Sequence, residues 1–153
     1  ANPSLIIADE PTTALDVSIQ AQILDLLKRM CREHGAAVVL VTHDMGVIAE
    51  TADRVAVMYS GRVVEIGSVK KVVGDPHHPY TKGLMHSIPR IGSKANRLTQ
   101  IDGAMPRLTD LPKGCAFHSR CPNAIPACLD EKPSAVPIDG GQVSCHLFEG
   151  EKA

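Results

Sequence analysis

Apolar residues near the start of the chain form two short runs separated by one amphipathic segment. Residues 4–8, Ser-Leu-Ile-Ile-Ala, form a continuous run, typical of a strand buried on both faces of a parallel sheet. From Asp16, a predicted N-cap, to Gly35, a predicted C-terminal stop, the periodicity indicates an amphipathic helix. Its apolar face consists of Ile19, Ile23, Leu26, Leu27 and Met30. A second buried strand is expected over residues 36–42, so the three elements predict a right-handed parallel crossover unit.

The pattern after residue 42 changes to shorter elements. We expect a short helix from Asp44 to about Glu50. Residues 54–59 and 62–66 are two strand-like runs separated by Ser-Gly, which predicts a β-hairpin.

One further helix is predicted in the second half of the chain. It covers residues 77–87, with Pro79 tolerated in its first turn, and Pro89 is expected to end it. We interpret His77 and His78 as the start of this helix and not as a metal-binding pair. From Ile91 onward, prolines and glycines recur and the periodicity fades, so an ordered structure there requires a cross-link.

Composition divides the chain into two parts. Nine of the 11 prolines lie at Pro76 or later, and four of the five cysteines lie at Cys115 or later. We therefore predict domains at residues 1–75 and 76–153. Cys31, on the amphipathic helix, is interpreted as a small buried side chain.

Overall composition excludes several classes of function. The 153 residues are 44% apolar and 22% charged, enough for one core or two small ones. Sixteen basic against 17 acidic side chains give a formal charge of -1, which argues against a nucleic-acid partner or an anionic membrane surface. No apolar run approaches the ~20 residues of a membrane span and no secretory signal is present, so we expect a soluble, cytosolic polypeptide.

Two acids follow the first predicted strand. In open parallel sheets, ligands bind beyond the carboxyl ends of the strands, where Asp9 and Glu10 would lie. An apolar run ending in Asp-Glu is the Walker B pattern of phosphoryl-transfer ATPases. Asp9 would hold Mg²⁺, and Glu10 would polarise the water that attacks the γ-phosphate. A pair of solvated acids at the end of a core strand is the alternative.

The surrounding motifs resemble the ATPases of ATP-binding cassette (ABC) transporters. Residues 9–16 read Asp-Glu-Pro-Thr-Thr-Ala-Leu-Asp, and residues 41–44 read Val-Thr-His-Asp. The resemblance implies that Asp16 lies in the D-loop, which crosses an ATPase dimer interface. It also implies that His43 contacts the γ-phosphate. Adjacent parallel strands would bring Glu10 and His43 to one edge of the sheet.

Other motifs of this family are not found in the sequence. There is no Gly-x-x-x-x-Gly-Lys-[Ser/Thr] phosphate loop, no Leu-Ser-Gly-Gly-Gln signature and no glutamine loop. We therefore expect a piece of a longer protein that alone neither binds ATP tightly nor hydrolyses it. The predicted fold is α/β: the C-terminal half of a P-loop, ABC-type nucleotide-binding domain, with a parallel sheet and a hairpin, followed by an irregular metal-stapled extension.

The second half resembles the C-terminal extension of the ATP-binding subunits of oligopeptide and dipeptide importers. The resemblance rests on Pro-His-His-Pro-Tyr-Thr at residues 76–81, on residues 84–89, on residues 114–121 and on Val-Ser-Cys-His at residues 143–146. It implies ATP hydrolysis coupled to peptide import. Nickel importers share much of this architecture, so an ATPase of nickel import is an alternative.

Four cysteines are predicted to share one structural role. Cys115, Cys121, Cys128 and Cys145 are separated by five, six and 16 residues. A reducing compartment disfavours disulfides and favours a metal centre. The spacing matches neither a zinc knuckle nor a bacterial ferredoxin run and leaves zinc and iron–sulfur equally open. The resemblance favours a [4Fe–4S] cluster ligated by all four, with Zn²⁺ as the alternative and free thiols as a third possibility.

The resemblance also implies an assembly. The intact subunit would pair with a second ATP-binding subunit, contact transmembrane permease subunits and act indirectly with an extracytoplasmic peptide-binding protein. It would lie at the cytoplasmic face of the membrane as a peripheral protein, without a transmembrane segment. Two other hypotheses are a stand-alone metal-binding or interaction module and, less favoured, an ABC-type ATPase of DNA repair or chromosome structure.

Overall fold

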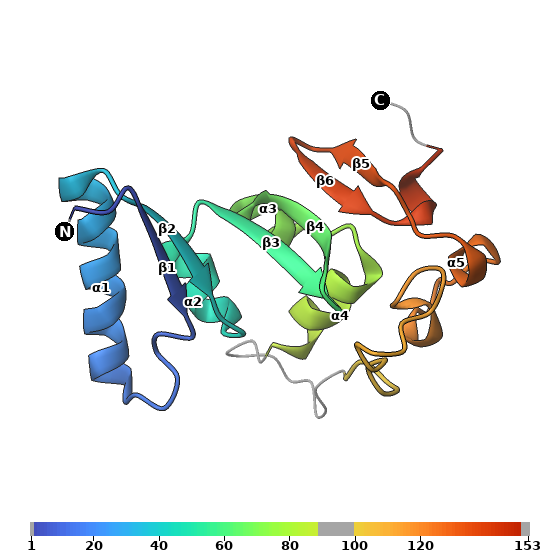
Figure 1. Ribbon diagram of the computed structural model, residues 1–153, viewed down its shortest axis with the longest axis horizontal. Helices are drawn as coiled ribbons and strands as arrows, with labels where there is room; N and C mark the ends of the chain where they lie inside the picture. The colour runs from blue at the N-terminus through green and yellow to red at the C-terminus, as the bar shows by residue number, and fades with distance from the viewer. Residues whose placement is uncertain (1, 89–99, 151–153) are drawn as a thin grey trace. The chain divides into compact units, whose positions relative to one another are not determined.

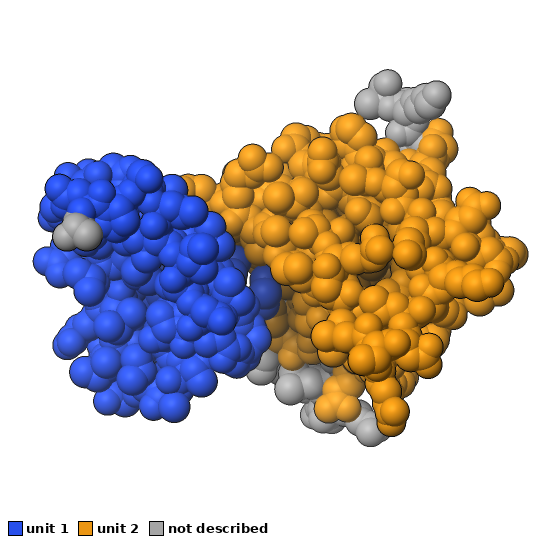
Figure 2. Space-filling view, in the orientation of Figure 1, with its two compact units in different colours: residues 1–52 blue, residues 53–153 orange. Residues whose placement is uncertain are grey.

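The computed structural model describes residues 2–88 and 100–150. The chain forms two compact units, residues 1–52 and residues 53–153, which are shown in different colours in Figure 2. Each unit contains its own sheet, and the two are described separately. In the described ranges, no helix has both the length and the apolar character needed to cross a lipid bilayer.

The first unit is the predicted strand–helix–strand crossover followed by a short helix (Figure 1). It comprises β1 (Leu5–Asp9), α1 (Val17–His34), β2 (Ala37–Val41) and α2 (Met45–Thr51). The two strands are parallel, with Leu5 opposite Ala37 and Asp9 opposite Val41.

The ends of α1 follow the capping chemistry that the sequence predicts. The Asp16 side chain accepts a hydrogen bond from the backbone N–H of Ile19 at 2.9 Å. Gly35 ends the helix with a φ of 65°, a left-handed conformation that glycine adopts without steric cost. Both predicted cap positions are confirmed.

The strands of this unit are not buried on both faces, and that prediction was wrong. Alternate residues along β1 and β2 are exposed, and Ile7 and Val39, which lie opposite each other, are 69% and 48% exposed. The opposite face is half-buried, and Leu24, Ala36, Val47 and Ile48 form the buried core of the unit. A continuous apolar run places apolar side chains on both faces of a strand. In this unit only one face of the two-stranded sheet is covered by other residues. Cys31 is also exposed, so its predicted burial was wrong.

The second unit is built on a four-stranded antiparallel sheet with the order β3-β4-β6-β5. The hairpin of β3 (Arg54–Tyr59) and β4 (Arg62–Ser68) was predicted and is confirmed. Its turn residues, Ser60 and Gly61, both have positive φ, as the tight hairpin turns that suit twisted strands require. The short strands β5 (Ala135–Ile138) and β6 (Gly141–Ser144), which were not predicted, pair with each other and extend this sheet.

The helices of the second unit are short. Within residues 53–88 and 100–150 they are α3 (Val69–Gly74), α4 (Pro79–Ser87), α5 (Ala127–Asp130) and two single 3₁₀ turns, His118–Arg120 and His146–Phe148. The predicted helix over residues 77–87 is α4, and Pro79 occupies its first turn. Pro89, the predicted stop, lies outside the described residues.

An aromatic cluster lies in the core of this unit. Tyr59 of β3 meets Tyr80 of α4 and Phe117 edge-on, with ring centroids 4.7 and 5.2 Å apart. Arg120 donates to the Tyr59 hydroxyl at 3.2 Å and to the carbonyl oxygens of Ile101 and Asp102, both at 2.9 Å. These contacts order the segment around residue 101, which has no regular secondary structure.

Candidate functional site

Glu10 follows β1 directly and has an unusual backbone. Its φ is 43°, in a region that residues other than glycine rarely adopt. Its N–H donates to the carbonyl of Val41 at 2.8 Å, which extends the parallel pairing by one residue, and its carbonyl accepts from the N–H of Thr13 at 3.1 Å. The turn after β1 therefore fixes Glu10 at the carboxyl end of the strand pair.

The side chain of Glu10 contacts His43, which follows the neighbouring strand. Glu10 Oε1 lies 2.9 Å from His43 Nδ1, and Oε2 accepts a hydrogen bond from the Thr13 hydroxyl at 2.8 Å. The hydrogen bond from His43, followed by that from Thr13, holds the pKa of Glu10 below its usual value. Because an ionised carboxylate only accepts, His43 carries a proton on Nδ1, and Nε2 remains available for another group. The side chain of His43 is 80% exposed, so this group has free access.

The other predicted nucleotide-site residues lie on the same unit. Asp9 ends β1 opposite Val41 and is exposed. Asp16 is exposed and caps α1, so its carboxylate already accepts one backbone N–H. Asp44, next to His43, caps α2 by accepting from the N–H groups of Gly46 and Val47, at 2.8 and 3.2 Å. Two helix N-termini and two strand ends thus determine the backbone around these acids.

The four cysteines of the second unit line one cavity. Its wall also includes His78, Pro79, Phe117, His118, Asn123, His146 and Leu147. Cys115 begins the turn that leads into the first 3₁₀ helix, and Cys121 directly follows that helix. Cys128 lies in α5, and Cys145 follows β6. Segments up to 30 residues apart therefore meet at a shared surface of thiols.

Short-range backbone contacts hold two of these segments together. The N–H of Cys115 donates to the carbonyl of Cys128 at 2.9 Å. The preceding residue is glycine because a Cβ on Gly114 would lie 2.3 Å from that same carbonyl oxygen and 2.7 Å from the carbonyl carbon of Leu129. A side chain at position 114 would force the backbone of α5 away.

The chemistry of this donor set fits a thiolate-bound metal centre. Burial raises the pKa of the Cys115 and Cys121 thiols and raises that of Cys145 to about 11, so without a metal these groups are protonated at neutral pH. Metal binding replaces the thiol protons. Four thiolates could ligate either a tetrahedral Zn²⁺ ion or a [4Fe–4S] cluster.

The histidines beside the cysteines are occupied by hydrogen bonds. His118 Nδ1 lies 2.7 Å from the carbonyl oxygen of Cys115. His146 uses both ring nitrogens, Nδ1 with Glu149 Oε2 at 2.6 Å and Nε2 with the carbonyl oxygen of Glu131 at 2.9 Å. His146 therefore supports the cavity wall and has no free nitrogen for a metal.

His78 also lines the cavity, and it confirms the prediction of a helix start. Its Nδ1 accepts a hydrogen bond from the N–H of Tyr80 at 3.0 Å, which caps α4. Burial lowers the pKa of His78 to about 4, so the ring stays neutral and able to accept this bond.

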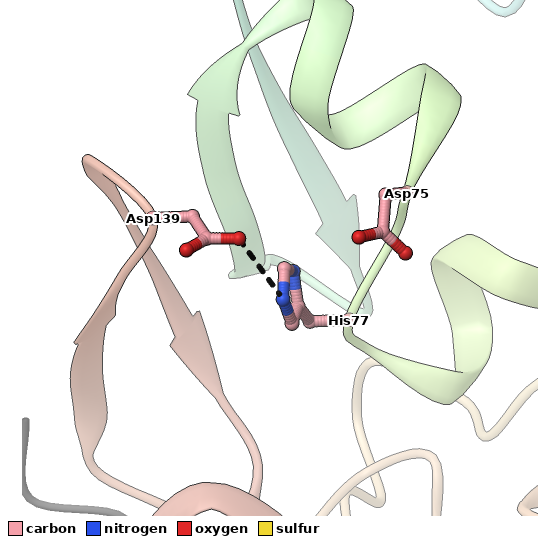
Figure 3. A group of neighbouring side chains, drawn as sticks. All are labelled: Asp75, His77 and Asp139. Atoms are coloured by element: carbon pink, nitrogen blue, oxygen red, sulfur yellow. Dashed lines mark ion pairs between the residues drawn. The ribbon is translucent and has the colours of Figure 1, made fainter.

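One group of side chains was not predicted. Asp75, His77 and Asp139 come from three separate segments and bring one potential ligand atom each within 4.8 Å of one another (Figure 3). These three residues have no recognisable spacing along the chain, so local sequence patterns do not predict the group.

A known protein family matches part of the second unit. Residues 64–128 match the family described as "Oligopeptide/dipeptide transporter, C-terminal region". The chain is 49% identical, over 99% of its length, to the oligopeptide transport ATP-binding protein AppD of Bacillus subtilis.

The chain is similar to the oligopeptide and dipeptide transport ATP-binding proteins. It is also 51% identical to the dipeptide transport ATP-binding protein DppD of Bacillus subtilis, over 95% of the chain. It is 48% identical to the oligopeptide transport ATP-binding protein OppD of Salmonella typhimurium, over 86% of the chain. The matched regions are 47%, 44% and 39% of these three proteins, so the chain spans less than half of the length of these transport ATP-binding proteins.

A solved structure with similarity to this chain is cbiO1 from Clostridium perfringens, described as part of the ABC transporter complex cbiONQ. The sequence identity is 37%, and the match covers 48% of this chain and 29% of cbiO1, with a TM-score of 0.44.

Proposed function

We propose that this chain is the C-terminal part of an ATP-binding subunit that powers the import of oligopeptides or dipeptides by ATP hydrolysis. The observation that carries the proposal is the 2.9 Å contact between Glu10 and His43 at the carboxyl end of two paired parallel strands. The similarity to peptide-transport ATP-binding proteins over nearly the whole chain supports the choice of solute class. The domains are residues 1–75, which belong to the ATPase, and residues 76–153, the extension.

In this proposal Glu10 orients and polarises the attacking water. Each oxygen of its carboxylate already accepts one hydrogen bond, from His43 or from Thr13, and each retains a lone pair for water. The lowered pKa of Glu10 keeps the carboxylate ionised at neutral pH, as this role requires. Its left-handed backbone is a strained conformation of the kind that concentrates at functional sites.

In this proposal His43 has a separate task at the γ-phosphate. Its Nδ1 is held by Glu10, so Nε2 is the atom that would contact the γ-phosphate. A protonated ring would donate to Glu10 and to the phosphate together and would add a positive charge where negative charge accumulates. Asp9 would hold Mg²⁺, which when bound neutralises phosphate charge.

The proposed assembly is a dimer of ATP-binding subunits in contact with transmembrane permease subunits. Asp16 would approach the second subunit, while its carboxylate continues to cap α1. The subunit would lie at the cytoplasmic face of the membrane as a peripheral protein, and a peptide-binding protein would act through the permease. Hydrolysis would reopen the dimer and allow the permease to change its access.

We also propose that the four cysteines hold a [4Fe–4S] cluster with a structural role. A cluster would cross-link α5 with the segments that carry Cys115, Cys121 and Cys145, in a region poor in regular secondary structure. The resemblance of the cysteine-bearing segments to those of peptide-importer ATP-binding subunits favours this cluster, with tetrahedral zinc as the alternative. Elemental analysis and visible absorption of anaerobically purified protein distinguish the two: iron with sulfide and a broad visible band are expected, and zinc without colour would exclude the cluster.

Two experiments test the proposed function. Sequencing the DNA upstream of the coding segment should reveal an in-frame phosphate loop and signature motif, whereas a stand-alone metal-binding module would show neither. The purified 153-residue chain should show no magnesium-dependent ATP turnover, because its sequence contains no phosphate loop. Turnover by this chain would contradict the proposal that it cannot hydrolyse ATP without a phosphate loop.

A further inference from the structure

Three side chains in the second unit form a compact group away from the cysteines. Asp75 follows α3, His77 lies in the link between α3 and α4, and Asp139 lies in the turn between β5 and β6. Figure 3 shows the three side chains meeting between these segments. One nitrogen or oxygen of each lies within 4.8 Å of the others. Both aspartates are exposed and His77 is half-buried, so the group is open to solvent on one side.

The imidazole of His77 is oriented by a buried carboxylate. Glu65 of β4, whose side chain is 3% exposed, accepts the backbone N–H of His77 at 2.8 Å. The same carboxylate oxygen lies 3.5 Å from Nδ1 of the His77 ring, and the other ring nitrogen, Nε2, lies 3.7 Å from Asp139 Oδ2. Phe148 contacts the ring edge-to-face at 5.6 Å. Nδ1 thus faces a fixed carboxylate, while Nε2 faces Asp139.

A similar arrangement is found at metal-binding histidines in proteins. A ligating histidine donates its second ring N–H to a carboxylate or carbonyl, which fixes the tautomer and turns the other nitrogen toward the metal. Here Glu65 Oε1 lies 3.5 Å from Nδ1, and the backbone N–H groups of His77 and His78 hold that carboxylate in place, so the group that would orient the ring is fixed.

We propose that Asp75, His77 and Asp139 bind a divalent cation, with Glu65 orienting His77. Two carboxylates and one imidazole suit Mn²⁺ and other divalent first-row metals that prefer oxygen and nitrogen, and water would complete the coordination. The bound ion would join the end of α3 and the start of α4 to the turn of the β5–β6 hairpin. The site is separate from the cysteine cavity, whose lining includes none of these three residues, and it does not depend on the proposed ATPase function.

Lys71 is the main competitor of a cation at this site. Its Nζ lies 3.4 Å from Asp139 Oδ2, the oxygen that faces His77. Without a metal, Lys71, Asp139, His77 and Glu65 would form an ion-pair network whose net effect on stability is small at such exposure. The two interpretations differ in what happens when Lys71 is removed, because an ion competes with the ammonium group for Asp139.

Titration of the purified 153-residue chain with Mn²⁺ alone, followed by the electron paramagnetic resonance signal of the free ion, tests the proposal. Mn²⁺ is chosen because it is a poor partner for the four thiolates. We expect one bound Mn²⁺ per chain and at least about tenfold weaker binding in D139N and D75N, because a lost ligand costs no less than a lost supporting hydrogen bond. Asparagine tolerates the φ of 47° at position 139, so D139N should keep the turn.

Two matched variants complete the experiment. D110N removes an exposed carboxylate of the same unit outside the group and should leave Mn²⁺ binding unchanged. K71M should bind Mn²⁺ equally or more tightly, because the competing ammonium group is gone. Absence of binding by the folded chain would overturn the proposal. Binding that D139N and D75N leave unchanged, or that K71M abolishes, would also overturn it.

Discussion

Oε2 of Glu65 accepts a hydrogen bond from the backbone N–H of His78 at 3.0 Å, and both residues are almost completely buried. Oε1 of the same carboxylate accepts the N–H of His77 at 2.8 Å. A strand of the sheet thus holds the start of α4 through one side chain, and His78 in turn lines the cysteine cavity. This link joins the sheet, the helix and the proposed metal centre.

Replacing Glu65 by alanine should destabilise the second unit strongly. The variant leaves two N–H groups without their acceptor, and losing charged hydrogen bonds of this kind costs about 3 kcal/mol. Urea unfolding, followed by tyrosine fluorescence, measures the change in the free energy of unfolding. Replacement of the exposed Glu33 by alanine is the control, with an expected change within about 0.5 kcal/mol. Equal stability of the two variants would show that Glu65 does not hold α4.

Gly114→Ala should damage the cysteine cavity. The added Cβ would meet the carbonyl oxygen of Cys128 at 2.3 Å, and backbone atoms cannot rotate away as a flexible side chain can. We expect a loss of about 1–3 kcal/mol and reduced metal content in the purified protein. Gly74→Ala is the matched control, because nothing lies within 4 Å of its Cβ. Normal metal content and stability in G114A would contradict the close packing of these segments.

The metal-free and metal-loaded forms should respond to pH in opposite directions. Burial raises the pKa of the Cys145 thiol from about 9 to about 11, so the folded metal-free state binds more protons than the unfolded state above pH 9. Its stability should therefore fall as pH rises from about 9 to about 11. A metal-loaded site holds thiolates, so its stability should instead fall on acidification. Thermal unfolding of both forms from acidic pH to about pH 11 measures the two slopes, and parallel slopes would exclude a thiolate-bound metal.

Removal of the metal should loosen one region selectively. Hydrogen exchange should quicken between residues 114 and 146, where the cysteines supply the cross-link, and change little in α1 and β2. Unchanged protection of residues 114–146 after removal of iron would refute the structural role proposed for the cluster.

Local sequence patterns predict the elements whose signals lie close together along the chain. The caps of α1, the Ser-Gly hairpin turn and the Pro79 helix start each depend on a few neighbouring residues, and all three are present in the structure. The pairing of β4 with β6 joins Glu65 to Val143, and no local pattern encodes a contact over that separation. Strand β5 was also obscured by Pro137, which lies at the edge of the sheet.

The candidate site shows the same limit. The pairing of Glu10 with His43 could be predicted because adjacent parallel strands end at a common edge. The group of Asp75, His77 and Asp139 could not, because it depends on the position of the β5–β6 turn. The exposure of Ile7 and Val39 could not be predicted either. An apolar run does not show whether the rest of the chain covers one face of the strand or both.

The most direct test of the account is the ATP hydrolysis rate of the complete subunit, in its dimer, with Glu10 replaced by glutamine. Glutamine preserves the size of the side chain but removes the charge that would polarise water and pair with His43. We predict that E10Q binds ATP and loses at least about 100-fold in turnover, as expected when a general base is removed. The control, E33Q, alters an exposed acid of the same unit and should keep the normal rate. Hydrolysis by E10Q at the normal rate would contradict the role assigned to the Glu10–His43 pair.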